Sequence, residues 1–311
     1  MWAREADLWS GSAAMHGLLR RAVQMQTAKG GTSSLSPAPP RCGPAGRALG
    51  GHLVRAGANR LTGGAAEVVN DRFLRSVELL RDEVDDFAAH PFSIPAIGTL
   101  SSVDLDAPVT MLAGENGSGK STLVEGIAVA AGFNAEGGTV NLRFGTTDEA
   151  SHSGLSEALR LVRGTGRPKT GFFLRAESFF NVASALDRLG GQTLESYGGR
   201  SLHERSHGES FLALVNNRFG PRGLYILDEP EAALSVTGNL ALLRRMQTLV
   251  GEGSQFIVAT HSPILLGFPE AAIYLLDSEG LQPTAYEDTP QFQLTRNFLE
   301  DRERFFHHLF D

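Results

Sequence analysis

The sequence has almost no cysteine and no long apolar run, and both absences exclude whole classes of protein. A single cysteine, Cys42, rules out an internal disulfide, which is expected of a protein in a reducing compartment. No uninterrupted apolar run approaches the roughly 18 residues that a membrane-spanning helix needs. No segment has the apolar core of a secretory signal either. We therefore expect a cytoplasmic protein with no transmembrane segment of its own.

Acidic residues are nearly absent from the first part of the chain. Between Leu8 and Ala66 there is no Asp or Glu, whereas residues 67–311 carry 33 acidic and 20 basic side chains. Residues 1–66 are also rich in Gly, Pro, Ser and Ala and have no helical or strand period, so they bury too little apolar area to fold. We predict a disordered basic tail over 1–66, with a start codon assigned too early or an organelle transit peptide as alternatives. A folded, acidic domain is predicted over 67–311.

Short apolar runs alternate with helical patterns in the folded region. Buried strands are predicted over 108–115, 170–175, 223–229, 254–260 and 271–277. Helices are predicted over 120–131, 209–219 and 237–250, and the terminal sequence FFHHLF, with His307 and His308, predicts a last helix. Residues 72–87 predict either a helix or a strand followed by a helix. The alternation predicts an α/β fold with a mainly parallel sheet flanked by helices.

The segment from Gly114 to Ser121 matches the phosphate-binding loop G-x-x-x-x-G-K-[ST]. The glycines let backbone N–H groups turn inward toward phosphate oxygens, and the following helix adds the positive end of its dipole. In this pattern Lys120 reaches the β- and γ-phosphates and the Ser121 hydroxyl ligates Mg²⁺. The candidate ATP-binding residues here are Gly114, Glu115, Asn116, Gly117, Ser118, Gly119, Lys120, Ser121 and Thr122.

Two further strand ends carry candidate catalytic side chains. The run LYILDEP ends in Asp228 and Glu229, and two adjacent acids at a buried strand end predict a cation between them. In phosphate-loop proteins the first acid holds Mg²⁺ and the second can deprotonate the attacking water. We expect Glu231, the next acid, to lie on the surface. The run FIVATHSP places His261 at the end of the next strand, where it could reach the γ-phosphate.

The stretch ERSHGESF, residues 204–211, requires a separate explanation. No serine in it lies in G-x-S-x-G, so it is not a hydrolase nucleophile elbow. His203 and His207 have the spacing of a helical metal pair, but Gly208 interrupts the helix there. The remaining interpretation is an anion-binding turn, in which Ser206 supplies a hydroxyl, Gly208 allows close approach and a helix N-terminus follows. Because the P-loop already surrounds its own phosphates, this turn is most useful facing a nucleotide on another subunit.

The order of these motifs resembles the ABC-type ATPase superfamily, with GENGSGKS as Walker A, SHGE as signature, LYILDE as Walker B and THS as switch histidine. Within it the chain looks most like the stand-alone bacterial predicted ATPases of the AAA-labelled group, which are related to SMC and RecF proteins. The resemblance covers roughly residues 85–285. It implies a P-loop NTPase fold of ABC ATPase-like type, with an antiparallel β element and a helical signature subdomain.

The resemblance also implies a role for each motif. Two ATP molecules would lie in a head-to-tail homodimer, each between the P-loop of one subunit and the signature turn of the other. The catalytic residues would be Glu229 as general base, His261 and Lys120; the metal site would be Ser121 and Asp228; and the signature acting on the partner's nucleotide would be Ser206, Gly208 and Glu209. Residues 231–235 would form the D-loop at the dimer interface.

The chain departs from the family pattern at the Q-loop and in the signature, where Arg205, His207 and Glu209 replace the transporter residues. The Q-loop glutamine is absent after 170–175, and Glu177 is the candidate for a Mg²⁺- or water-facing role there. Phe92 is either an adenine-stacking aromatic or a core residue. The predicted function is a soluble ATPase that uses ATP and Mg²⁺ and acts on an unidentified protein or nucleic-acid partner. The alternatives are a nucleic-acid repair or defence ATPase and the energy subunit of a membrane transporter. A P-loop kinase is weaker, because nothing resembles an acceptor-substrate lid.

Overall fold

The computed structural model describes residues 72–139, 154–177, 179 and 206–310, all within one compact unit, Gly64–Asp311. The predicted tail over 1–66 lies outside the described residues, as does His203 of the candidate metal pair.

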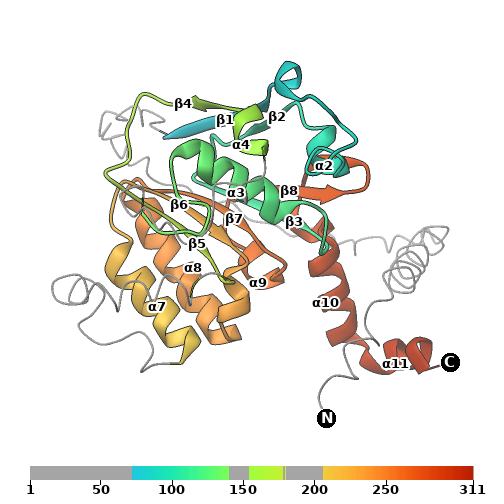
Figure 1. The fold of residues 1–311 in the computed structure, drawn as a ribbon. Helices are drawn as coiled ribbons and strands as arrows, with labels where there is room; N and C mark the ends of the chain where they lie inside the picture. Colours follow the sequence, from blue (N-terminus) through green and yellow to red (C-terminus); the bar gives the residue numbers. More distant parts are fainter. Residues whose placement is uncertain (1–71, 140–153, 178, 180–205, 311) are drawn as a thin grey trace, which may run out of the picture. The chain divides into compact units, whose positions relative to one another are not determined.

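The described residues form a main sheet of six strands in the order β5-β6-β7-β3-β8-β9 (Figure 1). Five strands run parallel, and β9 pairs antiparallel with β8. The strands are β3 (Val109–Gly114), β5 (Thr170–Arg175), β6 (Gly223–Asp228), β7 (Gln255–Ala259), β8 (Ala272–Asp277) and β9 (Gly280–Thr284). The five predicted strands agree with these bounds to within one residue at each end, and the mainly parallel sheet is confirmed.

Helices cover both faces of the main sheet, and alternate strand residues point to opposite faces. Met111 packs in a cluster with α7 (His207–Arg218) and α8 (Val236–Gly251), whereas its neighbour Leu112 packs in a second cluster with α3 (Lys120–Ala131). The central strands β3, β6 and β7 are therefore buried on both sides, which explains why their sequences show unbroken apolar runs in place of alternation. The helices predicted over 120–131, 209–219 and 237–250 are confirmed.

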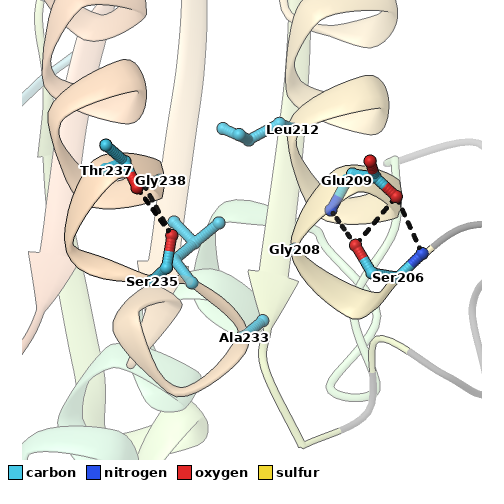
Figure 2. A pocket seen from close by; sticks show the side chains of 9 residues that line it. Ser206, Gly208, Glu209, Leu212, Ala233, Ser235, Thr237 and Gly238 are labelled. Carbon is cyan, nitrogen blue, oxygen red and sulfur yellow. Dashed lines mark hydrogen bonds between the residues drawn. The ribbon is translucent and has the colours of Figure 1, made fainter.

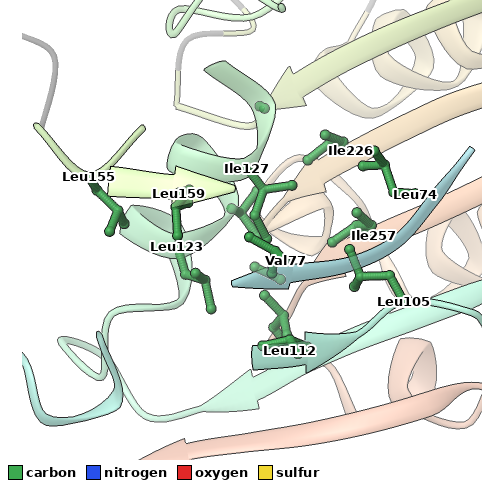
Figure 3. Packing of buried hydrophobic residues seen from close by; sticks show 14 of the residues in the cluster. Leu74, Val77, Leu105, Leu112, Leu123, Ile127, Leu155, Leu159, Ile226 and Ile257 are labelled. Carbon is green, nitrogen blue, oxygen red and sulfur yellow. The ribbon is translucent and has the colours of Figure 1, made fainter. Parts of the chain in front are cut away.

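A second, antiparallel sheet packs on the α3 side. It consists of β2 (Ser102–Asp104), β1 (Leu74–Leu79) and β4 (Leu159–Arg163), in that order. Leu74 and Val77 of β1 pack in the same buried cluster as Leu123 and Ile127 of α3 (Figure 3). Residues 72–87 thus form a strand followed by a short 3₁₀ turn, η2 (Arg81–Glu83), and are not one helix. The antiparallel element implied by the resemblance is present.

Short turns and two C-terminal helices complete the described structure. They are α2 (Pro95–Gly98), α4 (Leu155–Ala158), η5 (Pro230–Ala233), α9 (Pro263–Leu266), η6 (Tyr286–Asp288), α10 (Pro290–Glu300) and α11 (Arg302–Phe310). The predicted terminal helix is confirmed as part of α11, with His307 exposed. Of the implied signature subdomain, α7 is described and 180–205 lie outside the described residues. No helix in the described ranges is long and apolar enough to cross a membrane.

Gln255 joins the two sheets. Its side chain is 1 % exposed. Its Oε1 accepts the backbone N–H groups of Phe73 and Leu74, each at 3.0 Å, and its Nε2 donates to the carbonyls of Leu74 and Leu105, each at 2.7 Å. One buried amide at the start of β7 therefore satisfies four backbone groups around β1 and the end of β2.

Replacing Gln255 by leucine should lower the free energy of unfolding by about 3 kcal/mol or more, because buried backbone donors and acceptors lose their partners. The measurement is a urea titration followed by circular dichroism. Gln282→Leu on β9 is the matched control, since Gln282 is exposed, and it should change stability by less than about 0.5 kcal/mol. Equal effects of the two substitutions would contradict the bridging role.

Candidate active site

The P-loop follows β3 and ends where α3 begins. Gly117 and Gly119 have φ values of 79° and 97°, the left-handed region that glycine adopts without strain. A Cβ on Gly119 would lie 2.8 Å from Cγ2 of Ile94, and one on Gly114 would lie 2.5 Å from the carbonyl oxygen of Leu276. Gly114 and Gly119 are therefore sterically closed to larger residues, and the glycines permit the tight turn between β3 and α3.

Lys120 is buried among carboxylates. It is 3 % exposed, and its Nζ donates to the carbonyl oxygen of Glu115 at 2.8 Å within the loop. Burial lowers its pKa, and the opposing effect comes from the nearby carboxylates of Glu229, Asp228, Glu231 and Glu115. The ammonium group thus holds the loop backbone at Glu115.

Asp228 ends β6 and is 5 % exposed. Burial raises its pKa to about 6, against the charge of Arg175 and a hydrogen bond from Ser121, which favour the carboxylate. Its Oδ1 atom is buried without a hydrogen-bond partner among the described residues. A buried carboxylate with an open lone pair beside a serine hydroxyl fits a hydrated Mg²⁺ ion, which prefers oxygen ligands and keeps several waters.

Glu229 and His261 face each other across adjacent strand ends. Glu229 has a left-handed backbone (φ 48°, ψ 49°), a conformation uncommon outside glycine, and its N–H donates to the carbonyl of Ala259 at 2.9 Å. This turn directs its carboxylate at His261, with Oε1 3.0 Å from Nε2. The pair has the geometry of a base held by a histidine.

Glu231 holds the backbone of the histidine segment, so the expectation of a surface role was wrong. Its Oε1 accepts the N–H groups of His261 at 2.5 Å and Ser262 at 3.2 Å, and its Oε2 is buried without a hydrogen-bond partner in the described part of the chain. Its carboxylate therefore links η5, directly after Glu229, to the end of β7. The signal in the sequence was a third acid in DEPE, two residues beyond the candidate base.

Arg175 is a site residue that the sequence did not reveal. It ends β5 and is the register partner of Asp228 on β6. Its Nη1 lies 2.6 Å from Oε2 of Glu125 on α3, and its Nε lies 3.4 Å from Oδ2 of Asp228. Glu177 is exposed two residues later, and its charge helps to raise the pKa of Asp228. The candidate Q-loop residue thus lies within electrostatic range of the candidate metal ligand.

Ser206 caps α7. Its Oγ accepts the N–H of Glu209 at 3.4 Å, while its own N–H and hydroxyl donate to Oε2 of Glu209 at 3.0 and 2.9 Å (Figure 2). Ser206 and Glu209 therefore form a capping box, which fixes the helix start. A Cβ on Gly208 would lie 3.2 Å from the carbonyl oxygen of Ala233. Gly208 thus allows the signature turn to lie close to η5.

A cleft of about 370 Å³ lies between this turn and the start of α8. It is lined by Ser206, Gly208, Glu209, Leu212, Ala233, Leu234, Ser235, Thr237 and Gly238. Ser235 caps α8 by accepting the N–H of Gly238 at 3.2 Å, so two helix N-termini open onto one cleft (Figure 2). The lining includes no P-loop residue from the described ranges. The structure thus brings Lys120, Ser121, Asp228, Glu229 and His261 together, whereas the signature residues line a separate cleft.

The other candidates are less central. Phe92 is half-buried, packs against the cluster beneath α3 and meets the ring of Phe87 edge-on at 6.1 Å, which favours its core role. His207 begins α7 and is exposed. Within the described residues, no group of three or more His, Cys, Asp or Glu side chains could hold a metal ion.

Gln291 of α10 donates from Nε2 to the carbonyl of Gly114 at 3.2 Å and thereby holds the start of the P-loop.

A family model and solved structures resemble parts of this chain. A family model described as AAA domain matches residues 92–159, which include the P-loop. The SMC head domain from Thermotoga maritima is 16 % identical, with 68 % of this chain and 99 % of that chain covered and a TM-score of 0.39. An inward-facing ABC transporter described as of metal-chelate type is 16 % identical, with 70 % and 84 % covered and a TM-score of 0.41. No curated protein matches.

Proposed function

We propose that this chain hydrolyses ATP to ADP and phosphate. Its fold and its match to the AAA-domain family model support an ATPase of the ABC- and SMC-like superfamily. The observation that carries the proposal is the Glu229–His261 pair, 3.0 Å apart, next to Lys120 and Asp228. These side chains come from the carboxyl ends of β3, β6 and β7, which are parallel neighbours in the sheet and so end at one edge.

The P-loop binds the nucleotide in this proposal. Backbone N–H groups of the loop and the N-terminus of α3 surround the β- and γ-phosphates. Lys120 Nζ exchanges its bond to the Glu115 carbonyl for a phosphate oxygen. Ser121 and Asp228 would hold Mg²⁺, as the open Oδ1 atom of Asp228 supports. When bound, Mg²⁺ would neutralise charge on the phosphate oxygens.

Glu229 acts as the general base. Its carboxylate accepts a proton from water as the water oxygen bonds to the γ-phosphorus, and the bond from that phosphorus to the bridging oxygen breaks. The electron pair of that bond leaves on ADP, and the phosphoryl group leaves as inorganic phosphate. His261 orients the Glu229 carboxylate through its Nε2 contact and would contact the γ-phosphate. Glu231 holds the backbone of His261.

Hydrolysis takes place in a head-to-tail dimer. The N-terminus of α7, with Ser206, Gly208 and Glu209, faces the γ-phosphate bound to the other subunit. The capping box fixes the position of this turn at the start of α7. Val236 and Leu240 at the start of α8 are 65 % and 54 % exposed, so they give the same face an apolar surface for a second copy.

Phosphate release by the purified chain tests this function. Release should require both ATP and Mg²⁺, and saturating ATP should give a constant rate per subunit once dimers form. Added double-stranded DNA, at low and moderate salt, separates the nucleic-acid alternative, since charge-driven DNA binding weakens steeply with salt. Absence of both ATP binding and phosphate release under all these conditions would contradict the proposed function.

A further inference from the structure

Arg175 holds two carboxylates that belong to different elements. Its Nη1 lies 2.6 Å from Oε2 of Glu125 on α3, and its Nε lies 3.4 Å from Oδ2 of Asp228 on β6. The three side chains are 21 %, 16 % and 6 % exposed, respectively. A pair this well shielded from water interacts more strongly than a surface ion pair. The contact therefore connects the helix behind the P-loop to the strand end that carries Asp228.

Two buried polar atoms at this contact make no hydrogen bond within the described part of the chain. Asp228 Oδ1 and Arg175 Nε are buried without hydrogen-bond partners among the described residues. Buried groups of this kind are usually satisfied, so an unsatisfied donor and acceptor within one contact point to a missing partner. A hydrated cation would satisfy the Asp228 Oδ1 atom, because the waters bound to the cation donate hydrogen bonds to a carboxylate.

The position of Glu125 explains why arginine stands here. Glu125 follows Ser121 by four residues on α3, so both side chains lie on the same face of that helix. A guanidinium can bind two carboxylates at once with a fixed planar geometry, whereas a lysine ammonium acts as a single point charge. Arg175 therefore fixes the distance between the Ser121 side of α3 and the Asp228 carboxylate.

We propose that Arg175 is a positioning residue for Mg²⁺ binding, which holds the Asp228 carboxylate beside the Ser121 hydroxyl through its contact with Glu125. This inference rests on the proposed ATPase function and adds a residue to its metal site. The positive charge of Arg175 does not exclude a cation, because Glu125, Arg175 and Asp228 together carry a net charge of −1. Without Arg175, the carboxylates of Asp228, Glu229 and Glu125 repel one another and the orientation of Asp228 is lost.

The test is Mg²⁺ titration of nucleotide binding by the full chain, followed with a fluorescent ATP analogue, together with kcat and KM for ATP. In Arg175→Ala, affinity for the analogue in EDTA should equal that of the wild type. The apparent affinity for Mg²⁺ should fall about 10- to 100-fold, the usual cost of removing a residue that orients a metal ligand. The effect should appear in kcat at limiting Mg²⁺ and not in nucleotide binding without metal.

Three further variants make the test specific. Glu125→Gln should weaken Mg²⁺ binding in the same direction but less, because Arg175 keeps its contact with Asp228. Arg175→Lys should recover only part of the lost Mg²⁺ affinity, since lysine restores the positive charge but not the planar guanidinium with its several N–H donors. Arg167→Ala, an exposed arginine before β5, should match the wild type. If Arg175→Ala does not fold, Glu125→Gln and Arg175→Lys decide the outcome.

Unchanged or tighter Mg²⁺ binding by Arg175→Ala would overturn the inference, as would full recovery by Arg175→Lys. These results are distinguishable from failure of the proposed function. If the wild-type chain binds no nucleotide in either EDTA or Mg²⁺, the ATPase proposal itself fails.

Discussion

Replacing Glu229 by glutamine should lower the rate of ATP hydrolysis by about 10²- to 10⁴-fold, the usual contribution of a positioned general base. Glutamine keeps the size of the side chain and can still contact His261, which lies 3.0 Å away in the native chain. It cannot accept the proton of the attacking water. ATP binding should persist, since Lys120 and the loop backbone are unchanged. The measurements are kcat from phosphate release and Kd from equilibrium binding.

Glu252→Gln is the matched control for this prediction. Glu252 is an exposed residue that follows α8, so its loss should leave kcat and Kd at wild-type values. Wild-type turnover in the Glu229 variant would show that another group deprotonates the water, and the role assigned to Glu229 would be wrong.

Replacing Lys120 by methionine should weaken ATP binding about 100-fold, since a charge-assisted hydrogen bond contributes up to about 3 kcal/mol. Methionine retains the length of the apolar stem but removes the cation. Lys120 is surrounded by the carboxylates of Glu229, Asp228, Glu231 and Glu115. Without the cation, these groups would repel the triphosphate. Equilibrium binding of a fluorescent ATP analogue in EDTA measures the effect without any contribution from Mg²⁺.

Lys169→Met serves as its control, because Lys169 is exposed in the loop before β5. Thermal unfolding of both variants checks that the fold is retained. Equal binding by the two variants, with both folded, would remove Lys120 from the nucleotide site.

The five parallel strands of the main sheet could be predicted because strands covered by helices on both faces carry unbroken apolar runs, whereas the more exposed β9 was not predicted. Residues 72–87 could not be assigned, because only three of the six residues in β1 are fully buried and the strand depends on pairing with β2 and β4. Those partners lie far away in the sequence. Pairing across such distances leaves no local pattern, and η2 directly after the strand adds helical geometry.

The candidate site also contains residues that could be predicted from the sequence and one that could not. Lys120, Asp228, Glu229 and His261 follow recognisable strand ends, so their proximity could be expected from parallel topology alone. Arg175 could not, since its neighbour Asp228 is 53 positions away and meets it only through the β5–β6 register. An arginine at a strand end otherwise looks like an ordinary solvated charge.

The most direct test of the central claim is the solution mass of the Glu229→Gln chain by light scattering, with and without ATP and Mg²⁺. The account predicts monomers without nucleotide and dimers with it, because bound ATP persists when hydrolysis is blocked. Adding Ser206→Arg should abolish the dimer by filling the signature turn, whereas Ser102→Arg on β2, which is exposed, should not. Monomers in both conditions, with ATP shown to be bound, would contradict the head-to-tail dimer.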